Sequence, residues 1–289
     1  MSRTVRTLHP AHRDDIGDLI TRRPLPGPRL AQLDPFLFLN HHGPMQYGPN
    51  NQGLPFGPHP HRGFETVTFI LEGDLAHLDS GGHASVIHAG GVQWMTAGSG
   101  LIHAEVSPSS FKRSGGPLEI LQLWVNLPSR LKMTAPAYTG LQREDIPVVT
   151  LDDGRVTVDV IAGEVFGVSG PVASLTGVTM TTAALRASGE VTLPAPAGQA
   201  VFMYVVSGEV SIGGAAVAPW QLVELNDDGN DVKVAAVTDA RLLYGYAAPL
   251  AEPVVAQGPF VMKTREEIAQ AARDYYDGKF GGVPNLSMA

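Results

Sequence analysis

Cysteine is absent from the 289-residue chain. Its absence excludes disulfides, thiolate nucleophiles, iron–sulfur clusters and cysteine-ligated zinc sites. Charged residues are sparse, at 17% of the sequence, and aromatic residues make up only 7%. Hydrophobic residues reach 44%, which is enough for a large core and excludes a wholly disordered chain.

Positive charge is the scarcer sign, with 20 Lys and Arg against 28 Asp and Glu, for a net charge of −8. An acidic balance argues against binding to a phosphate backbone, so we expect no direct nucleic-acid partner. Long hydrophobic runs are also missing: Val201–Val206 is among the longest, and a bilayer span needs about 20 residues. The N-terminus has no apolar stretch of signal-peptide length. We therefore expect a soluble, cytoplasmic protein without a membrane partner.

Short β-type runs separated by glycine and proline dominate the chain, which carries 33 Gly and 23 Pro. Such a series predicts an all-β sandwich or barrel. The predicted strands are Glu65–Leu71, Ser85–Ile87, Val92–Thr96 and Leu118–Leu127, then Val156–Ala162, Val172–Ala183, Val201–Val206, Val217–Leu225, Val232–Val237 and Leu242–Tyr246.

One helix is predicted, at the C-terminus. Thr264 followed by Glu267 matches a capping box, in which each side chain satisfies an exposed backbone N–H. The helix should run from about Arg265 to Asp277 and end at Gly278, because glycine readily adopts the left-handed conformation that terminates helices.

A weak internal repeat relates the two halves at an offset of 135 residues. GFETVTFILEGDL, beginning at Gly63, lies over GQAVFMYVVSGEV, beginning at Gly198, as an ungapped strand–turn–strand match. Two copies of one β-barrel unit are the simplest architecture that fits. The mixed, proline-bearing stretch after Leu127 is interpreted as the connection, which predicts domains at residues 1–130 and 131–289.

Histidine is distributed very unevenly. All ten histidines lie in the first 103 residues, and the repeat offset maps His59 to Pro194 and His61 to Pro196. If the halves share a fold, imidazole chemistry is therefore confined to the first barrel.

Two short motifs can bring metal-binding side chains together. His59 and His61 are two residues apart at the start of a predicted strand, and His103 and Glu105 repeat that spacing downstream. Residues two apart on a strand face the same side, so each pair can point into one barrel. Three imidazoles and a carboxylate suit Fe(II), Mn, Ni, Cu or Zn and leave exchangeable positions open. The alternative is an alternating surface strand with no ligand role.

Three longer strings carry a resemblance to a known family. They are GPHPHRGFETVTFILEG, GGVQWMTAGSGLIHAEV and GPFVMKTREEIAQAARDYYDGKFG, and the resemblance runs from about Arg22 through the C-terminal helix. These strings resemble the pirin family of the cupin superfamily. The resemblance implies two tandem cupin (jelly-roll-like) β-barrels with a C-terminal helix, the second barrel being degenerate. It also implies one mononuclear divalent metal, usually iron, in the first barrel, with His59, His61, His103 and Glu105 as ligands.

Other polar residues allow more than one interpretation. Glu65 can orient a ligand imidazole or can be a solvent-facing strand carboxylate. His41 and His42 precede the barrel, and His41 can line a pocket or be an ordinary loop histidine. His77, His83 and His88 lie on a predicted hairpin and are expected to be solvated.

The family resemblance implies a metal-dependent dioxygenase that cleaves the heterocyclic ring of flavonols such as quercetin with O₂ and releases CO. In that case the partners are a small aromatic substrate and O₂, and Glu105 is the expected catalytic base for the flavonol 3-hydroxyl. The alternative function is a regulatory protein that binds a transcription or enzyme partner according to its metal or redox state. A metal-assisted isomerase or hydrolase is a third interpretation, because cupin folds support many chemistries.

Overall fold

The computed structural model describes residues 1–288, and the chain divides into two compact units. The N-terminal barrel unit comprises Arg13–Arg22, Phe38–Arg143 and Ala251–Ala289. The C-terminal barrel unit comprises Met1–His12, Arg23–Leu37 and Glu144–Leu250. Each unit is thus assembled from three stretches of chain, and the last stretch returns to the N-terminal barrel unit.

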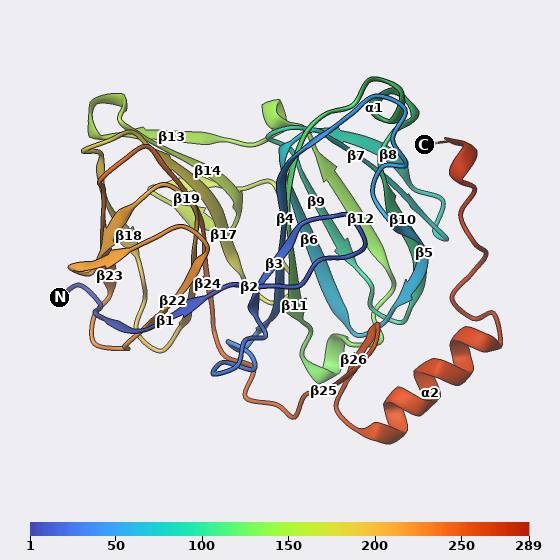
Figure 1. Cartoon of the computed structure of the whole chain (residues 1–289). Coiled ribbons are helices and arrows are strands. Elements are labelled where there is room, and N and C mark those ends of the chain that lie inside the picture. The colour runs from blue at the N-terminus through green and yellow to red at the C-terminus, as the bar shows by residue number, and fades with distance from the viewer. Residues whose placement is uncertain (289) are drawn as a thin grey trace. The chain divides into compact units, whose positions relative to one another are not determined.

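Two sheets build the N-terminal barrel (Figure 1). The larger sheet has the strand order β12 (Ala137–Leu141), β9 (Val92–Thr96), β6 (Phe64–Glu72), β11 (Gly116–Asn126), β4 (Phe36–Tyr47), β3 (Thr21–Leu25) and β2 (His12–Arg13). The smaller sheet has the order β5 (Phe56–His61), β10 (Leu101–Val106), β7 (Asp74–Asp79) and β8 (Ala84–His88).

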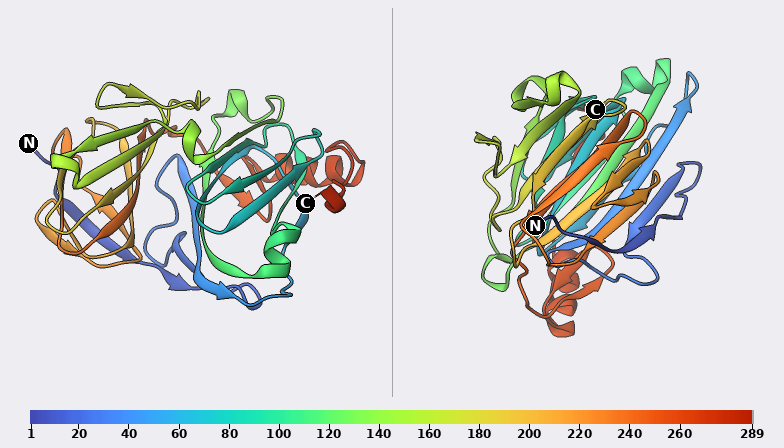
Figure 2. Two further views of the ribbon diagram at one scale, coloured as in Figure 1. Left: turned by 90° about the horizontal axis from the view of Figure 1, so that it is seen from above. Right: turned by 90° about the vertical axis from the view of Figure 1, so that its left-hand side faces the viewer.

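Two equivalent sheets build the C-terminal barrel. The larger has the order β1 (Val5–Pro10), β22 (Gln221–Leu225), β19 (Ala200–Ser207), β24 (Ala240–Ala247), β17 (Thr179–Leu185), β14 (Val156–Ala162) and β13 (Val148–Leu151). The smaller has the order β18 (Glu190–Pro194), β23 (Asp231–Ala236), β20 (Val210–Ile212) and β21 (Ala215–Val217). In Figure 2 the strands of each unit wrap around that unit's own interior.

Short elements complete the chain. Two further strand pairs are β15 (Glu164–Val165) with β16 (Val168–Ser169), and β25 (Val255–Gln257) with β26 (Phe260–Met262). The helices are α1 (Ser109–Ser114) and α2 (Arg265–Tyr276), with 3₁₀ turns η1 (Ser129–Leu131), η2 (Arg143–Asp145), η3 (Asp152–Gly154) and η4 (Leu286–Met288). None of the helices in residues 1–288 has the length and apolar character that crossing a membrane requires.

The strand order confirms the repeat predicted at an offset of 135 residues. β6 and β19 lie within the two large sheets, and each is followed by a turn glycine, Gly73 or Gly208, with positive φ. The next strands, β7 and β20, occupy matching places in the small sheets. Both β6 and β19 are buried along almost their whole length, which explains why they read as continuous apolar runs rather than alternating ones.

Two predicted strands are wrong at their boundaries. The prediction Val217–Leu225 is interrupted because Pro219 lacks an N–H and Trp220 adopts a φ of 64°, so the chain turns there. The prediction Val172–Ala183 starts too early. Ser174 accepts hydrogen bonds from the N–H groups of Thr176 and Val178, and this turn delays the strand.

The predicted C-terminal helix is confirmed as α2. Thr264 Oγ1 accepts a hydrogen bond from the N–H of Glu267, and Glu267 in turn accepts one from the N–H of Lys263. Gly278 follows the helix with a φ of 75°, as expected for a residue that ends it. The short helix α1 is not predicted, because six residues without a side-chain cap carry little sequence signal.

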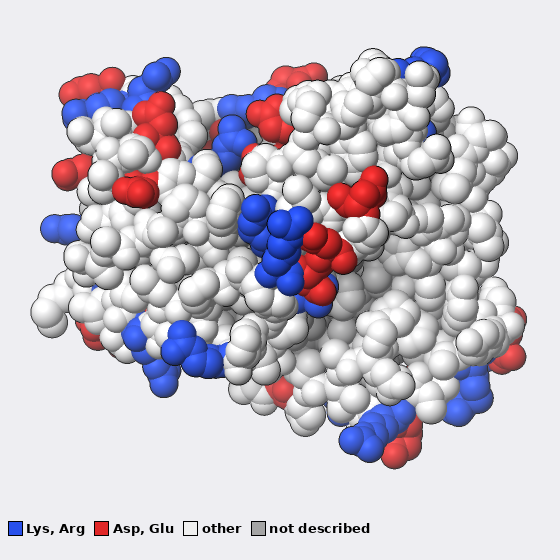
Figure 3. All heavy atoms as spheres, viewed as in Figure 1, with Lys and Arg blue, Asp and Glu red and all other residues white. Residues whose placement is uncertain are grey.

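The two barrels differ in what fills them. Aliphatic side chains such as Leu193, Val205 and Leu242 fill the C-terminal barrel, and each is 0% exposed. In the N-terminal barrel, buried polar side chains such as His103 and Glu105 lie among the apolar ones. Lys and Arg of the face in Figure 3 lie in small separate groups, several beside Asp or Glu.

Removing buried volume should destabilise the C-terminal barrel. We expect Leu242→Ala to lower the free energy of unfolding by about 2–5 kcal/mol, because it leaves a cavity in a packed core. The matched control is Val237→Ala, at a side chain that is 62% exposed, which should change stability by roughly 0.5 kcal/mol or less. Urea unfolding of both variants measures the difference, and equal losses would contradict the assigned core.

Candidate metal centre

Antiparallel pairing of β5 with β10 brings the two histidine motifs together. In this register His59 lies directly opposite His103, and His61 lies opposite Leu101. Alternation along β5 then directs His59 and His61 to the same side. The imidazole rings of His59, His61 and His103 have pairwise centroid distances of 4.4–4.9 Å. One nitrogen of each ring lies within 4.8 Å of the others, so the three side chains can hold a metal ion.

Backbone carbonyls fix the tautomers of two of these imidazoles. His59 Nδ1–H donates to the carbonyl oxygen of Gly57 at 2.7 Å, and His61 Nδ1–H donates to that of Pro259 at 3.2 Å. A carbonyl can only accept, so the proton sits on Nδ1 and the lone pair on Nε2 is free. Such a bond to the second ring nitrogen is typical of metal-ligating histidines.

The third imidazole has no partner of its own. His103 is 0% exposed, and among residues 1–288 neither of its ring nitrogens has a hydrogen-bond partner. A buried polar atom without a partner is costly and calls for an explanation such as an ion. The donor chemistry fits, because neutral imidazole is a common ligand of divalent transition metals.

Burial keeps two of these imidazoles, those of His61 and His103, neutral. It lowers the pKa of His61 to about 3, an effect that the charge of His59 reinforces and the bond to Pro259 opposes. Burial, with the charges of His61, His59 and His77, also lowers the pKa of His103 well below its usual value. Neutral imidazole is the form that binds a metal, so protons do not compete for these two nitrogens near neutral pH.

Glu105 lies on the same strand as His103 but outside the three-histidine group. It is 2% exposed, and its two carboxylate oxygens accept hydrogen bonds from Thr68 Oγ1 at 2.8 Å and Gln122 Nε2 at 2.5 Å. A carboxylate offers about four lone pairs, so these two bonds leave it able to accept a proton or a cation.

A very small cavity, of about 10 Å³, adjoins Glu105. Apolar and polar side chains both line it, namely His42, Leu54, Phe56, Thr68, Leu75, Glu105, Ile120 and Gln122. Sites for drug-sized ligands usually measure about 300–1,000 Å³. This cavity has room for about one water molecule, so a three-ring ligand does not fit inside it without movement of the lining side chains.

His77 is a buried residue whose place the sequence analysis predicted wrongly. It was expected to be solvated, but it is 1% exposed and pairs with Glu105 across β7 and β10. His77 Nε2 lies 3.2 Å from a carboxylate oxygen of Asp79, and its ring stacks on Tyr138 at 4.0 Å. The hairpin prediction itself is correct, and His83 and His88 on it are exposed. Only the spacing of His77 and Asp79 could have signalled a shared inward face.

Neither interpretation of Glu65 holds. The side chain is 1% exposed, so it does not face solvent, and its Oε1 accepts a hydrogen bond from Thr96 rather than from an imidazole. Strand alternation places Glu65 on the face of β6 opposite Thr68. Burial raises the pKa of Glu65, and the bond from Thr96 opposes the rise.

The two histidines before the barrel are buried on β4, not in a loop. His41 Nε2 lies 2.9 Å from Glu119 Oε1. His42, and not His41, lines the cavity, where its ring packs against Phe56 at 5.1 Å.

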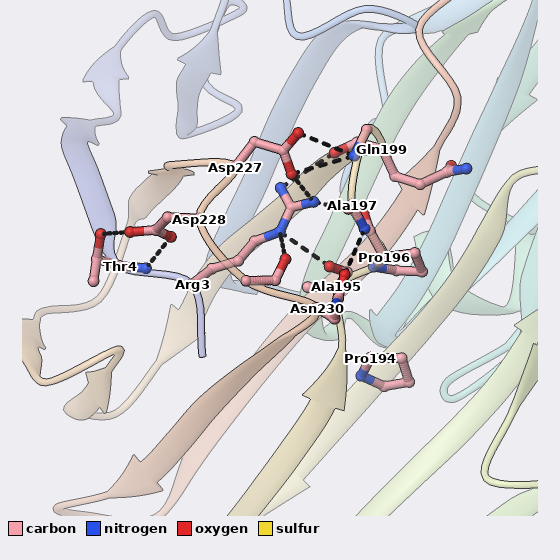
Figure 4. A network of polar contacts seen from close by, with 12 residues as sticks. Arg3, Thr4, Pro194, Ala195, Pro196, Ala197, Gln199, Asp227, Asp228 and Asn230 are labelled. Carbon is pink, nitrogen blue, oxygen red and sulfur yellow. Dashed lines mark hydrogen bonds and ion pairs between the residues drawn. The ribbon is translucent and has the colours of Figure 1, made fainter. Parts of the chain in front are cut away.

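In the C-terminal barrel, an arginine contacts the segment that corresponds to the first histidine motif. Pro194 ends β18, the strand equivalent to β5, and the segment after it contacts Arg3 (Figure 4). The Arg3 guanidinium donates to the carbonyls of Ala195, Pro196 and Gly229 at 2.5–3.2 Å and pairs with Asp227 at 2.6 Å. A buried cation here satisfies backbone oxygens, and the segment that it contacts carries no histidine.

Two family models match the chain. The Pirin model matches residues 18–125, and the Pirin C-terminal cupin domain model matches residues 180–281. A Pseudomonas aeruginosa protein that carries the provisional name quercetin 2,3-dioxygenase is 40% identical over 248 residues, covering 86% of this chain and 87% of that protein. Human Pirin is 40% identical over 267 residues, covering 90% of this chain and 87% of that protein.

A solved structure agrees with these matches. The crystal structure of a quercetin 2,3-dioxygenase from Acinetobacter baumannii superposes with a TM-score of 0.92 at 34% identity, covering 98% of this chain and all of that one. The matched regions include both histidine motifs and the C-terminal helix. The chain belongs to the pirin family, with two tandem cupin barrels.

Proposed function

We propose that the N-terminal barrel binds one divalent metal at His59, His61 and His103, with Glu105 as fourth ligand and catalytic base. We further propose that the protein is a dioxygenase that cleaves flavonols such as quercetin and releases CO. The observation that carries the proposal is the group of three histidines, two of them buried, that each offer an imidazole nitrogen within 4.8 Å of the others. The names of the relatives support the substrate. The family resemblance favours Fe(II), although the same donors suit Mn, Ni, Cu or Zn.

The residues around the proposed metal site have different roles in the reaction. A bound divalent metal supplies Lewis acidity that lowers the pKa of a coordinated hydroxyl. Glu105 accepts the proton of the flavonol 3-hydroxyl, while Thr68 and Gln122 keep its carboxylate in place. The electron-rich enolate then reacts with O₂, and opening of the heterocycle releases CO and leaves a depside. Phe56 and Leu75 help to exclude water from the reacting ring.

Each of the three histidines should be required for tight metal binding. We expect His59→Ala, His61→Ala and His103→Ala each to abolish it, because two imidazoles and a carboxylate hold a divalent ion far less firmly. Metal content per chain is measured after loading and desalting. The control is His88→Ala, at an exposed histidine of the same barrel, which should bind as the wild type does. One metal per chain in all three variants would refute the site.

Quercetin turnover tests the activity itself. The protein is loaded separately with Fe, Mn, Ni, Cu and Zn, quercetin is added in air, and the loss of its absorbance is followed together with CO release. We expect turnover with CO in at least one metal form and none in His59→Ala. Bound metal without turnover in every form would contradict a flavonol dioxygenase and favour a regulatory role or a different substrate.

Replacing the catalytic base should separate chemistry from metal binding. We expect Glu105→Gln to lower kcat by about 10²–10⁴-fold, the usual contribution of a general base, while the three histidines still retain metal. The control is Glu72→Gln, at an exposed carboxylate that ends β6. A kcat within a few-fold of the wild type would show that Glu105 is not the base.

A further inference from the structure

The last part of the chain packs directly on the strand that carries His103. This C-terminal segment consists of residues 259–280 and contains β26 and α2. Ile102, the neighbour of His103, forms one apolar cluster with Phe260, Met262, Ile268, Ala271 and Phe280. The segment therefore covers β10 at the position of the third imidazole.

Glycines in both histidine motifs allow this close approach. A Cβ at Gly63 would lie 2.0 Å from the carbonyl oxygen of Val261, and a Cβ at Gly100 would lie 2.5 Å from the ring of Phe280. Both glycines also have positive φ, of 89° and 121°. Each motif thus leaves space for the same C-terminal segment.

Hydrogen bonds join the segment to the first motif. Besides accepting from His61 Nδ1, the segment donates from the N–H of Val261 to the carbonyl of Arg62 at 3.0 Å. The buried Lys132 Nζ bridges the first motif and the C-terminal segment, donating to the carbonyls of Gly63 at 2.9 Å and Val261 at 3.1 Å. These contacts at Arg62, Gly63 and Val261 therefore hold the carbonyl of Pro259 beside His61.

Arg62 connects both motifs to α2. Its Nε donates to the carbonyl of Ser99, in the second motif, at 2.7 Å. Its Nη1 donates to Asp274 of α2 at 2.8 Å, and its guanidinium lies 4.6 Å from the ring centroid of Phe280. Asp274 is also held by Gln270 and Lys279. Since Arg62 directly follows His61, anchoring its side chain restricts the imidazole beside it.

We propose that the C-terminal segment is a working part of the metal centre: through the Pro259 carbonyl it holds His61 in the Nδ1–H tautomer, and Arg62 and Asp274 are positioning residues that keep this carbonyl in place. The inference rests on the proposed metal site. Without an acceptor at Nδ1, the proton of a neutral imidazole is free to move to Nε2. In that form the nitrogen facing the other two histidines has no lone pair for a metal.

The test compares two charge-neutralising variants of the α2 region. Asp274→Asn removes the carboxylate that anchors Arg62, whereas the control Asp277→Asn removes an equivalent charge that is 61% exposed and forms an ion pair with Lys279. Co(II) affinity is measured by competition with a chelator. In the metal-free protein, ¹⁵N-histidine NMR reports which nitrogen of His61 carries the proton, with the signal assigned by a His61→Gln variant.

We expect Asp274→Asn to weaken Co(II) binding roughly tenfold, the lower end for losing support of a ligand histidine, and to shift His61 away from the Nδ1–H form. Asp277→Asn should match the wild type in both measurements. A lower Tm for Asp274→Asn with unchanged Co(II) affinity and unchanged His61 signals would reduce the segment to a structural role and overturn the proposal.

A second pair of variants tests the same proposal if Asp274→Asn does not fold. Phe280→Leu removes the ring beneath Arg62, and Tyr276→Leu, at a side chain that is 85% exposed, is its control. The same two measurements and the same criteria apply. Failure of the wild type to bind Co(II) would overturn both the metal site and this inference. Metal binding without quercetin turnover would contradict the dioxygenase alone.

Discussion

The pairing of His59 with His103 across β5 and β10 is the constraint on which the rest of the site depends. It places imidazole nitrogens against one another in an interior where His103 has no hydrogen-bond partner in the described chain. Water would satisfy such atoms at a surface, but burial leaves that task to the protein or to an ion. Carbonyls satisfy the Nδ1 atoms of His59 and His61, so what remains free is the set of nitrogens that converge on one point.

Duplication of the barrel explains why one unit is specialised and the other is not. Both use the same strand order, but the interior of the C-terminal barrel is aliphatic. The loop equivalent to the first histidine motif is hydrogen-bonded to Arg3. Arg62 has a similar role in the N-terminal barrel, where its guanidinium donates a hydrogen bond to the carbonyl of Ser99 in the loop of the second motif. In both barrels a buried arginine joins these loops, and only in the first do the loops carry histidines.

Sequence patterns predicted the fold because they are local. The strand–turn–strand pattern within each copy of the repeat, the two-residue histidine spacing and the capping box at Thr264 each depend on near neighbours, and the observed strands and α2 follow them. The strand prediction failed where a local turn overrode an apolar run, at Ser174 and at Trp220. Prolines and glycines within apolar stretches thus deserve more weight than the run of hydrophobicity itself.

Long-range contacts set the limit for the site. Whether His77 and Glu65 are buried depends on which strands flank theirs, and the sequence does not reveal those neighbours. The carbonyl of Pro259 accepts a hydrogen bond from His61, 198 residues away. Every residue has a backbone carbonyl, so no sequence motif indicates which one forms this bond. Sequence patterns could therefore identify the histidines of the site but not the backbone and side-chain groups that surround them.

Anomalous diffraction from a crystal of the metal-loaded protein, recorded at the absorption edge of the metal, locates the ion among the side chains. We expect a single strong peak in the N-terminal barrel, at about 2 Å from one nitrogen each of His59, His61 and His103. A peak at any other group of side chains, or none after loading, would contradict the proposed metal site.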